Sequence, residues 1–169
     1  CPNFFEETDH KYCGVMNDGC YEWVTRSIRD FNQELFTGVT PPHPSIYING
    51  GFQIVNKKHK KFFSNMKEFY SGNKERIQYA IDKIKAGTDQ TIVNYMLEIN
   101  EVDVKILPAC YNLQDLFRKN LLHIPGHSWW PDTLEGMYSA GWVYHFNAIP
   151  QNERHANYWI ERTYKELYR

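Results

Sequence analysis

At residues 47–56 the chain reads Tyr-Ile-Asn-Gly-Gly-Phe-Gln-Ile-Val-Asn, a β-strand sequence that is interrupted in its middle. Aromatic and β-branched residues at both ends favour a strand, whereas Asn49, Gly50 and Gly51 remove bulk where a packed strand needs it. Glycine inside a strand marks a bulge or a place where a ligand or another backbone comes close. The stretch therefore predicts a strand that faces a ligand, with an Asn-Gly hairpin turn as the alternative.

The flanking sequence predicts an α/β fold. Residues 57–70 combine lysines with aromatic residues at helical spacing, so a helix is expected directly after the strand. A strand that leads into a helix is typical of an α/β unit. Further strands are predicted over residues 12–16, 102–107 and 142–146, and further helices over residues 21–36, 74–85, 88–97 and 150–168.

The basic character of residues 57–70 has two interpretations. Five lysines, namely Lys57, Lys58, Lys60, Lys61 and Lys67, lie in this short segment. A charge run of this kind usually forms a solvated helix face. A phosphate-binding patch is the alternative.

Length and composition restrict the class of protein. A chain of 169 residues predicts a single domain, 1–169. The net charge of -1 gives no electrostatic reason to expect nucleic acid or a membrane surface as a partner, and no apolar run is long enough for a membrane helix. Four cysteines are too few for a disulfide scaffold of this length, which favours a reducing compartment, so a cytoplasmic location is expected.

Three further segments carry candidate binding residues. Asp89 and Gln90 open a predicted helix and would lie at its N-terminal end, where capping alone would also explain Asp89. A long loop at residues 123–141 contains Trp129 and Trp130, whose indole rings could stack on the C–H faces of a sugar or could simply fix the loop to the core. His145 follows a run of strand formers, where a lone histidine is more often a core residue than a ligand.

The order of these segments resembles a known family. The GT-A fold glycosyltransferases, closest in pattern to the family 8 type that includes glycogenin and bacterial galactosyltransferases, carry similar motifs in the same order. The matching motifs here are Tyr47 to Gly51, Asp89-Gln90 with Asn94, Leu107-Pro108 with Tyr111-Asn112, and His145-Phe146. The resemblance implies a three-layer α/β/α fold of the nucleotide-diphospho-sugar transferase type.

The resemblance also implies a function and roles for the candidate residues. The expected activity is transfer of a sugar from a nucleotide-sugar donor to a carbohydrate or glycosylated acceptor, with Mn²⁺ or Mg²⁺ stabilising the charge of the diphosphate leaving group. Asp89 and Gln90 would line the transfer site as catalytic residues, and His145 would be a metal ligand, as suits imidazole. Asn49, Gly50 and Gly51 would shape the sugar pocket, and Trp129 and Trp130 would bind the acceptor.

The chain also departs from the family pattern. It contains no Asp-x-Asp motif, and its first residue is Cys rather than Met, so we expect a fragment or processed product that corresponds to the acceptor-side, C-terminal half. The Gly-x-x-Lys-Pro-Trp pattern expected after His145 is missing as well. Two alternatives stay open: a non-catalytic, truncated module that binds carbohydrate or a protein partner, and a structural domain in which a neighbouring side chain fills the gap at Gly50 and Gly51.

Overall fold

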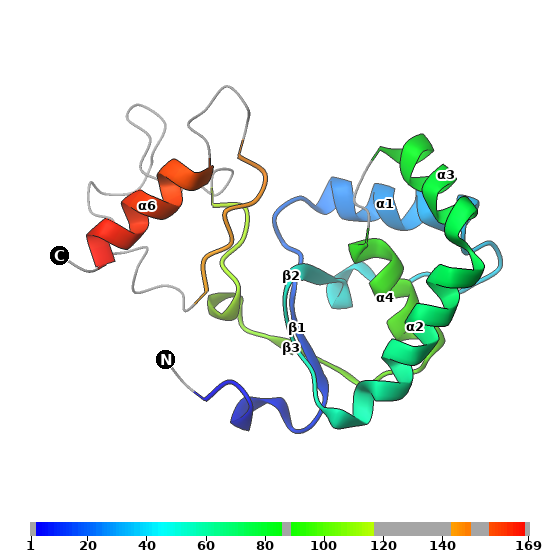
Figure 1. Ribbon diagram of the computed structural model, residues 1–169, viewed down its shortest axis with the longest axis horizontal. Coiled ribbons are helices and arrows are strands. Elements are labelled where there is room, and N and C mark those ends of the chain that lie inside the picture. The colour runs from blue at the N-terminus through cyan, green and yellow to red at the C-terminus, as the bar shows by residue number, and fades with distance from the viewer. Residues whose placement is uncertain (1–2, 86–88, 117–142, 150–155, 168–169) are drawn as a thin grey trace. The chain divides into compact units, whose positions relative to one another are not determined.

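The chain divides into two compact units. A computed structural model describes residues 3–85, 89–116, 143–149 and 156–167 (Figure 1). The first unit spans Cys1–Leu107 and the second spans Pro108–Arg169. The single domain expected from the length therefore stays a prediction.

A small mixed sheet forms the centre of the first unit. β1 (Tyr12–Met16) is its middle strand, β2 (Ile48–Ile54) pairs with it antiparallel, and β3 (Val104–Leu107) pairs with it parallel. These strands fall where the sequence predicted them, which confirms a mixed α/β fold. Asn49, Gly50 and Gly51 lie inside β2, so the alternative of a hairpin turn at these residues is wrong.

The two glycines of β2 coincide with an irregularity in its pairing. Gly14 faces Gln53 and Met16 faces Ile48, so the single residue Val15 of β1 lies opposite four residues of β2, from Asn49 to Phe52. The extra residues form a bulge, which is one of the two features that glycine in a strand indicates. Bulges redirect the backbone, and they are common beside binding sites.

The described residues of the first unit also form four helices, and each matches a predicted helix. They are α1 (Tyr21–Glu34), α2 (Lys60–Gly72), α3 (Lys74–Ile84) and α4 (Gln90–Ile99). Short 3-10 turns precede β1, β2 and α2, at η1 (Glu6–Thr8), η2 (Pro44–Ile46) and η3 (Lys57–His59). All four helices contribute buried side chains to one core together with Tyr12 and Ile48 of the sheet. The three-layer α/β/α arrangement stays a prediction.

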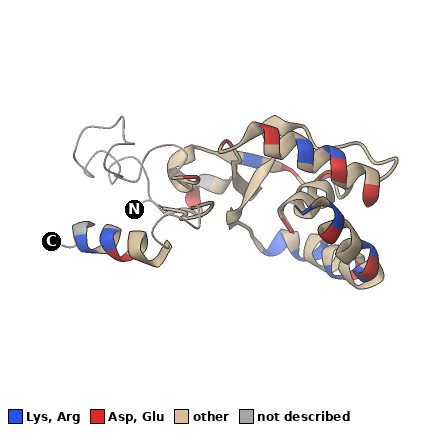
Figure 2. Cartoon of the chain, turned by 90° about the horizontal axis from the view of Figure 1, so that it is seen from above, with Lys and Arg blue, Asp and Glu red and all other residues tan. Residues whose placement is uncertain are grey.

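The surface charges of the helices are mixed. Lys or Arg and Asp or Glu both occur on α1, α2 and α3 (Figure 2). None of the described helices has the length and apolar character that are needed to cross a membrane.

The second unit contains little regular structure among its described residues. η4 (Ala109–Tyr111) is followed by an isolated parallel bridge between Leu113 and Tyr144, and α6 (Ala156–Leu167) follows later. The strand predicted over residues 142–146 is wrong, because the described part of it, from residue 143, forms only this bridge. Asp115 has a left-handed φ of 53°, which ends the extended conformation of the backbone two residues after Leu113. The ladder therefore stops after one pair.

Gly14 generates a prediction about the sheet. A Cβ atom at this position would lie 2.9 Å from Cβ of Ile48. Both atoms belong to β1 and β2, which are paired with each other in the sheet. We expect Gly14→Ala to lower the free energy of unfolding by about 1–3 kcal/mol, as overpacking does. Urea unfolding followed by circular dichroism measures this change.

Gly72→Ala is the matched control. A Cβ atom there would meet nothing within 4 Å, and the residue ends α2, so alanine should leave stability unchanged or raise it by up to about 1 kcal/mol. Equal effects of the two substitutions would contradict the contact between β1 and Ile48.

Candidate functional site

The first turns of α4 close the outer edge of β2. Oδ1 of Asn94 accepts the backbone N–H of Ile48 at 2.8 Å, and Nδ2 of Asn94 donates to the carbonyl of Ile48 at 2.9 Å. Because β2 is an edge strand, these backbone groups have no strand on that side to bond with. Asn94 is buried, so the carboxamide replaces a neighbouring strand where water cannot.

Gln90 lies one helical turn before Asn94 and contacts the glycine bulge. Its Oε1 accepts the backbone N–H of Gly50 at 2.8 Å and the carboxamide of Asn49 at 3.3 Å. Asn49 in turn accepts the N–H of Gly51 at 2.8 Å, which fixes the conformation of the bulge. Nε2 of Gln90 is buried, and the Gln90 carboxamide also interacts with the hydroxyl group of Tyr47. We use the name bulge cluster for five residues: Asn49, Gly50, Gly51, Asp89 and Gln90.

Packing does not require glycine at position 50. A Cβ atom there would lie 3.5 Å from both Cβ and Oε1 of Gln90, which is ordinary van der Waals contact, and the backbone is not left-handed. Gln90 therefore borders the gap at Gly50 and leaves room for about one methyl group. The contact with Gln90 supports the alternative in which a neighbouring side chain fills this gap, and the space that remains also agrees with a ligand that approaches the backbone.

Asp89 occupies the N-cap position of α4. Its Oδ1 accepts the backbone N–H of Gln90 at 2.9 Å, and the residue is exposed. Capping is thus a role that the geometry supports, and it leaves the carboxylate at the surface beside the bulge. A surface carboxylate next to an open backbone can accept hydrogen bonds from hydroxyl groups.

The bulge cluster lies at the end of the sheet where parallel strands β1 and β3 finish. Ile48 pairs with Met16, the last residue of β1, and the bulge follows immediately. Next to these residues in the chain, the hydroxyl groups of Tyr47 and Thr91 share a hydrogen bond of 2.7 Å. Burial raises the pKa of Tyr47 to about 12. In open α/β sheets, ligands bind outside the carboxyl ends of the strands. The cluster is therefore placed where such a fold offers a site.

His145 belongs to the second unit. Its backbone N–H donates to the carbonyl of Leu113 at 2.8 Å, which fixes the main chain at this point. The ring is half-buried, its Nδ1 is buried, and no described residue forms a hydrogen bond with that nitrogen. Burial lowers the pKa of His145, and the negative charge of Asp115 opposes this effect. The neutral imidazole that results is the form that binds a metal ion.

The structure brings together most of the residues that the sequence singled out. Asn49, Gly50, Gly51, Asp89 and Gln90 form one cluster, although they come from segments about forty residues apart. His145 lies in the other unit, and Trp129 and Trp130 fall outside the described residues. The sequence motif included Asn94 but gave it no role, although its spacing of four residues from Gln90 places both side chains on one helix face.

Asn94 generates a stability prediction. Asn94→Leu keeps the size of the side chain but leaves the buried N–H and C=O of Ile48 without partners, which should lower the free energy of unfolding by about 2–4 kcal/mol. Gln78→Leu, on the exposed face of α3, is the control, and we expect a change of at most about 0.5 kcal/mol. Urea unfolding measures both changes, and amide hydrogen exchange at Ile48 should accelerate in Asn94→Leu alone. Equal destabilisation by both substitutions would refute the edge-closing role.

His145 generates a prediction about pH. Because the folded-state pKa lies below the ordinary value of 6.5, the stability that neutral His145 contributes is complete above pH 6.5 and is lost as the pH falls through the folded-state pKa. An NMR titration of the ring, assigned by comparison with His145→Asn, should give a midpoint below 6.5. A midpoint above 6.5 would show that Asp115 rather than burial controls the ring.

The bulge cluster and His145 are the two chemically distinctive parts of the described chain. No known family model, curated protein or solved structure matches this sequence. The order of the sequence motifs and the geometry of these residues are therefore the features that bear on function.

Proposed function

We propose that this chain is the acceptor-side part of a metal-dependent glycosyltransferase of the GT-A type, which transfers a sugar from a nucleotide-sugar donor to a carbohydrate or glycosylated acceptor. One observation supports the proposal most directly: Oε1 of Gln90 binds the N–H of Gly50 at 2.8 Å. This contact joins two of the motifs that resemble the family. Two motifs that contact each other in the fold support a shared site more strongly than two motifs that only occur in the expected order along the sequence.

The chemistry of the bulge cluster suits sugar hydroxyl groups. Asp89 supplies a surface carboxylate as an acceptor, and Asn49 supplies a carboxamide that can donate and accept. Gly50 and Gly51 are exposed and have no side chains of their own, so a ligand can approach the backbone at the part of the bulge that Gln90 leaves open. In this proposal Asp89 and Gln90 orient the transferred sugar, and Asn49 with Gly50 and Gly51 forms the wall of its pocket.

The metal ion of the proposed reaction would bind at His145. The buried Nδ1 of the neutral ring, which has no hydrogen-bond partner among the described residues, fits one position of an Mn²⁺ or Mg²⁺ site. When bound, the ion would stabilise negative charge on the diphosphate leaving group. The described residues contain no cluster of three His, Cys, Asp or Glu side chains, so other ligands of this ion would come from residues beyond the described ones.

Two broader expectations belong to the same proposal. The mixed sheet with α4 over its edge is compatible with one part of a three-layer GT-A fold. Cys13, Cys20 and Cys110 are free thiols, which agrees with a cytoplasmic location.

Asp89→Asn in the full-length protein tests the proposal. Asparagine caps helices as well as aspartate does, so we expect the melting temperature to change by less than about 2 °C. Loss of the charged acceptor should lower sugar transfer by about 10- to 100-fold, because hydrogen bonds to charged groups contribute about 1.5–3 kcal/mol. Transfer is measured with a panel of nucleotide sugars in the presence of Mn²⁺, and EDTA should abolish it.

Asp82→Asn is the matched control, because it removes the same charge from an exposed position on α3 and should leave transfer unchanged. Full activity of Asp89→Asn would assign Asp89 to capping alone. A full-length protein that binds a glycan or a protein partner but turns over no nucleotide sugar would favour the non-catalytic module instead.

A further inference from the structure

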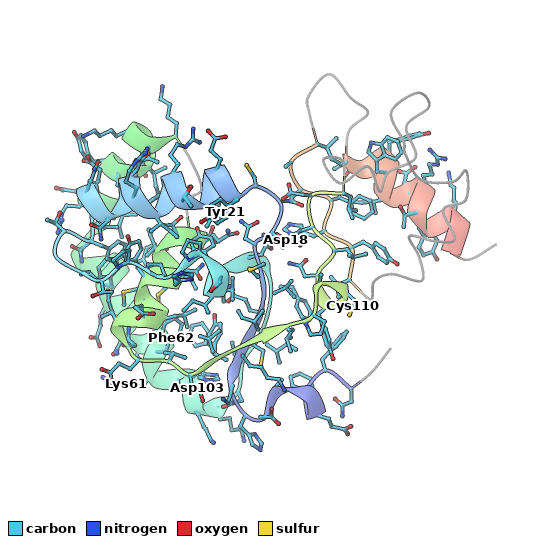
Figure 3. All side chains as sticks on the ribbon, turned by 180° about the vertical axis from the view of Figure 1, so that it is seen from behind. Asp18, Tyr21, Lys61, Phe62, Asp103 and Cys110 are labelled. Carbon is cyan, nitrogen blue, oxygen red and sulfur yellow. The ribbon has the colours of Figure 1, made fainter. Side chains whose placement is uncertain are left out.

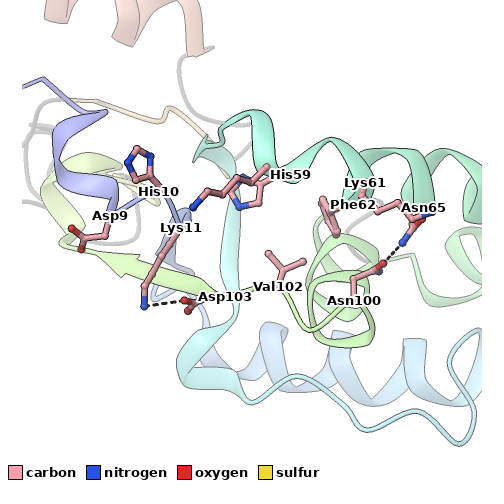
Figure 4. Close-up of a pocket in the computed structure, with 11 residues that line it drawn as sticks. Asp9, His10, Lys11, His59, Lys61, Phe62, Asn65, Asn100, Val102 and Asp103 are labelled. Carbon is pink, nitrogen blue, oxygen red and sulfur yellow. Dashed lines mark hydrogen bonds and ion pairs between the residues drawn. The ribbon is translucent and has the colours of Figure 1, made fainter.

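A cavity of about 430 Å³ opens at the end of the sheet where β1 and β3 begin (Figure 4). Lys11 and Asp103, which directly precede these strands, form one side of it through an ion pair of 3.0 Å. The start of α2 forms another side, and Phe62 and Val102 add apolar surface. A volume of this size is sufficient for a small ligand.

The cavity lies at the opposite end of the sheet from the bulge cluster. The bulge follows the pairing of Ile48 with the last residue of β1, whereas the cavity precedes the first residue of that strand. In Figure 3, Lys61 and Asp103 beside the cavity are well separated from Asp18 and Tyr21, which follow β1. A ligand in this cavity is therefore independent of the proposed transfer site.

The cavity has an excess of positive charge. Both of its carboxylates are already paired with lysines, Asp9 with Lys105 at 2.7 Å and Asp103 with Lys11 at 3.0 Å. The ammonium groups of Lys58 and Lys61, which also line the cavity, form no ion pair or hydrogen bond with a described residue. About two positive charges thus remain uncompensated, which matches the charge of a phosphate monoester at neutral pH.

The position of these lysines is unfavourable for the helix itself. Lysines at residues 57, 58, 60 and 61 surround the beginning of α2, and its first turn contains no acidic residue. The N-terminus of a helix carries partial positive charge, so cations there destabilise it and anions stabilise it. Natural sequences depart from such local rules mainly at functional sites. A bound anion would remove the conflict.

The polar groups around the lysines are held in place. Nδ1 of His59 accepts the backbone N–H of Asn56 at 3.1 Å, so the neutral ring carries its proton on Nε2 and can donate it. Asn65 donates to the carboxamide of Asn100, which itself donates to the carbonyl of Met96 at 2.7 Å. These fixed amides can bind hydroxyl groups, and Phe62, which is largely buried, adds a small apolar part of the cavity wall.

We propose that this cavity binds a small phosphorylated sugar, with its phosphate on Lys58, Lys61 and the Nε2–H of His59. The hydroxyl groups of the sugar would contact the carboxamides of Asn65 and Asn100. The lysine run of α2 is then a phosphate patch rather than only a solvated helix face. This site does not depend on the proposed transfer activity.

Isothermal titration calorimetry of the full chain with glucose 6-phosphate tests the proposal. We expect binding that weakens at least tenfold in the variant Lys58→Gln/Lys61→Gln, while glucose without phosphate does not bind. The matched control is Lys57→Gln/Lys60→Gln, which removes the same two charges from the same end of α2 but from residues that do not line the cavity. Its affinity should stay within about threefold of the unmodified chain, because general electrostatic attraction is weak at physiological salt.

Circular dichroism establishes that the variants are folded, and both lysine pairs should keep or slightly raise the melting temperature. Absence of binding to the unmodified chain, or equal weakening in both lysine pairs, would overturn the proposal. Equal affinity for inorganic phosphate and glucose 6-phosphate would refute the sugar contacts. Asp89→Asn should bind glucose 6-phosphate normally, which separates failure of this site from failure of the proposed function.

Discussion

The hydrogen bonds between Asn94 and both backbone groups of Ile48 determine where α4 lies against the sheet. Beyond the first turn, the backbone N–H groups of a helix are used internally, so Asn94, inside α4, can reach the strand edge only through its side chain. Once Asn94 is fixed, Gln90 lies one turn away on the same face and is carried to the N–H of Gly50. The geometry of the bulge cluster follows from this one side chain.

The two ends of the sheet have different chemistry as a consequence of its topology. At the end where β1 and β3 finish, the bulge of β2 and the cap of α4 present carboxamides, a carboxylate and bare backbone. At the end where they begin, the entry into α2 brings lysines beside the residues that precede each strand. Because β2 runs antiparallel to β1, a single strand connects the first set of groups to the second.

Local patterns in the sequence predicted most of the first unit. Helical periodicity identified α1 to α4, because each helix buries one apolar face, and strand formers identified the three strands, among them the continuously buried β1. The glycines at positions 50 and 51 correctly indicated a bulge or a close approach. The same reasoning failed at residues 142–146, where strand formers were present but the left-handed backbone at Asp115 limits the partner segment to one bridge.

The contacts that assemble the sites could not be predicted in this way. The bond from Gln90 to Gly50 spans forty residues, and the cavity combines residues from before β1, before β3 and the start of α2. Such contacts depend on strand order and register, which periodicity does not encode. The lysine run illustrates this point, since its sequence alone favours a solvated helix face over a phosphate patch.

The closed edge of β2 has a consequence for the behaviour of the protein in solution. An uncovered edge strand offers its backbone to any extended chain nearby, including a second copy of the same protein. Here the outward N–H and C=O of Ile48 and the N–H of Gly50 are already occupied by the carboxamides of α4. A bulge beside them further prevents the flat, continuous pairing on which intermolecular strand addition depends. The residues that form the candidate site thus also protect this strand from self-association and aggregation.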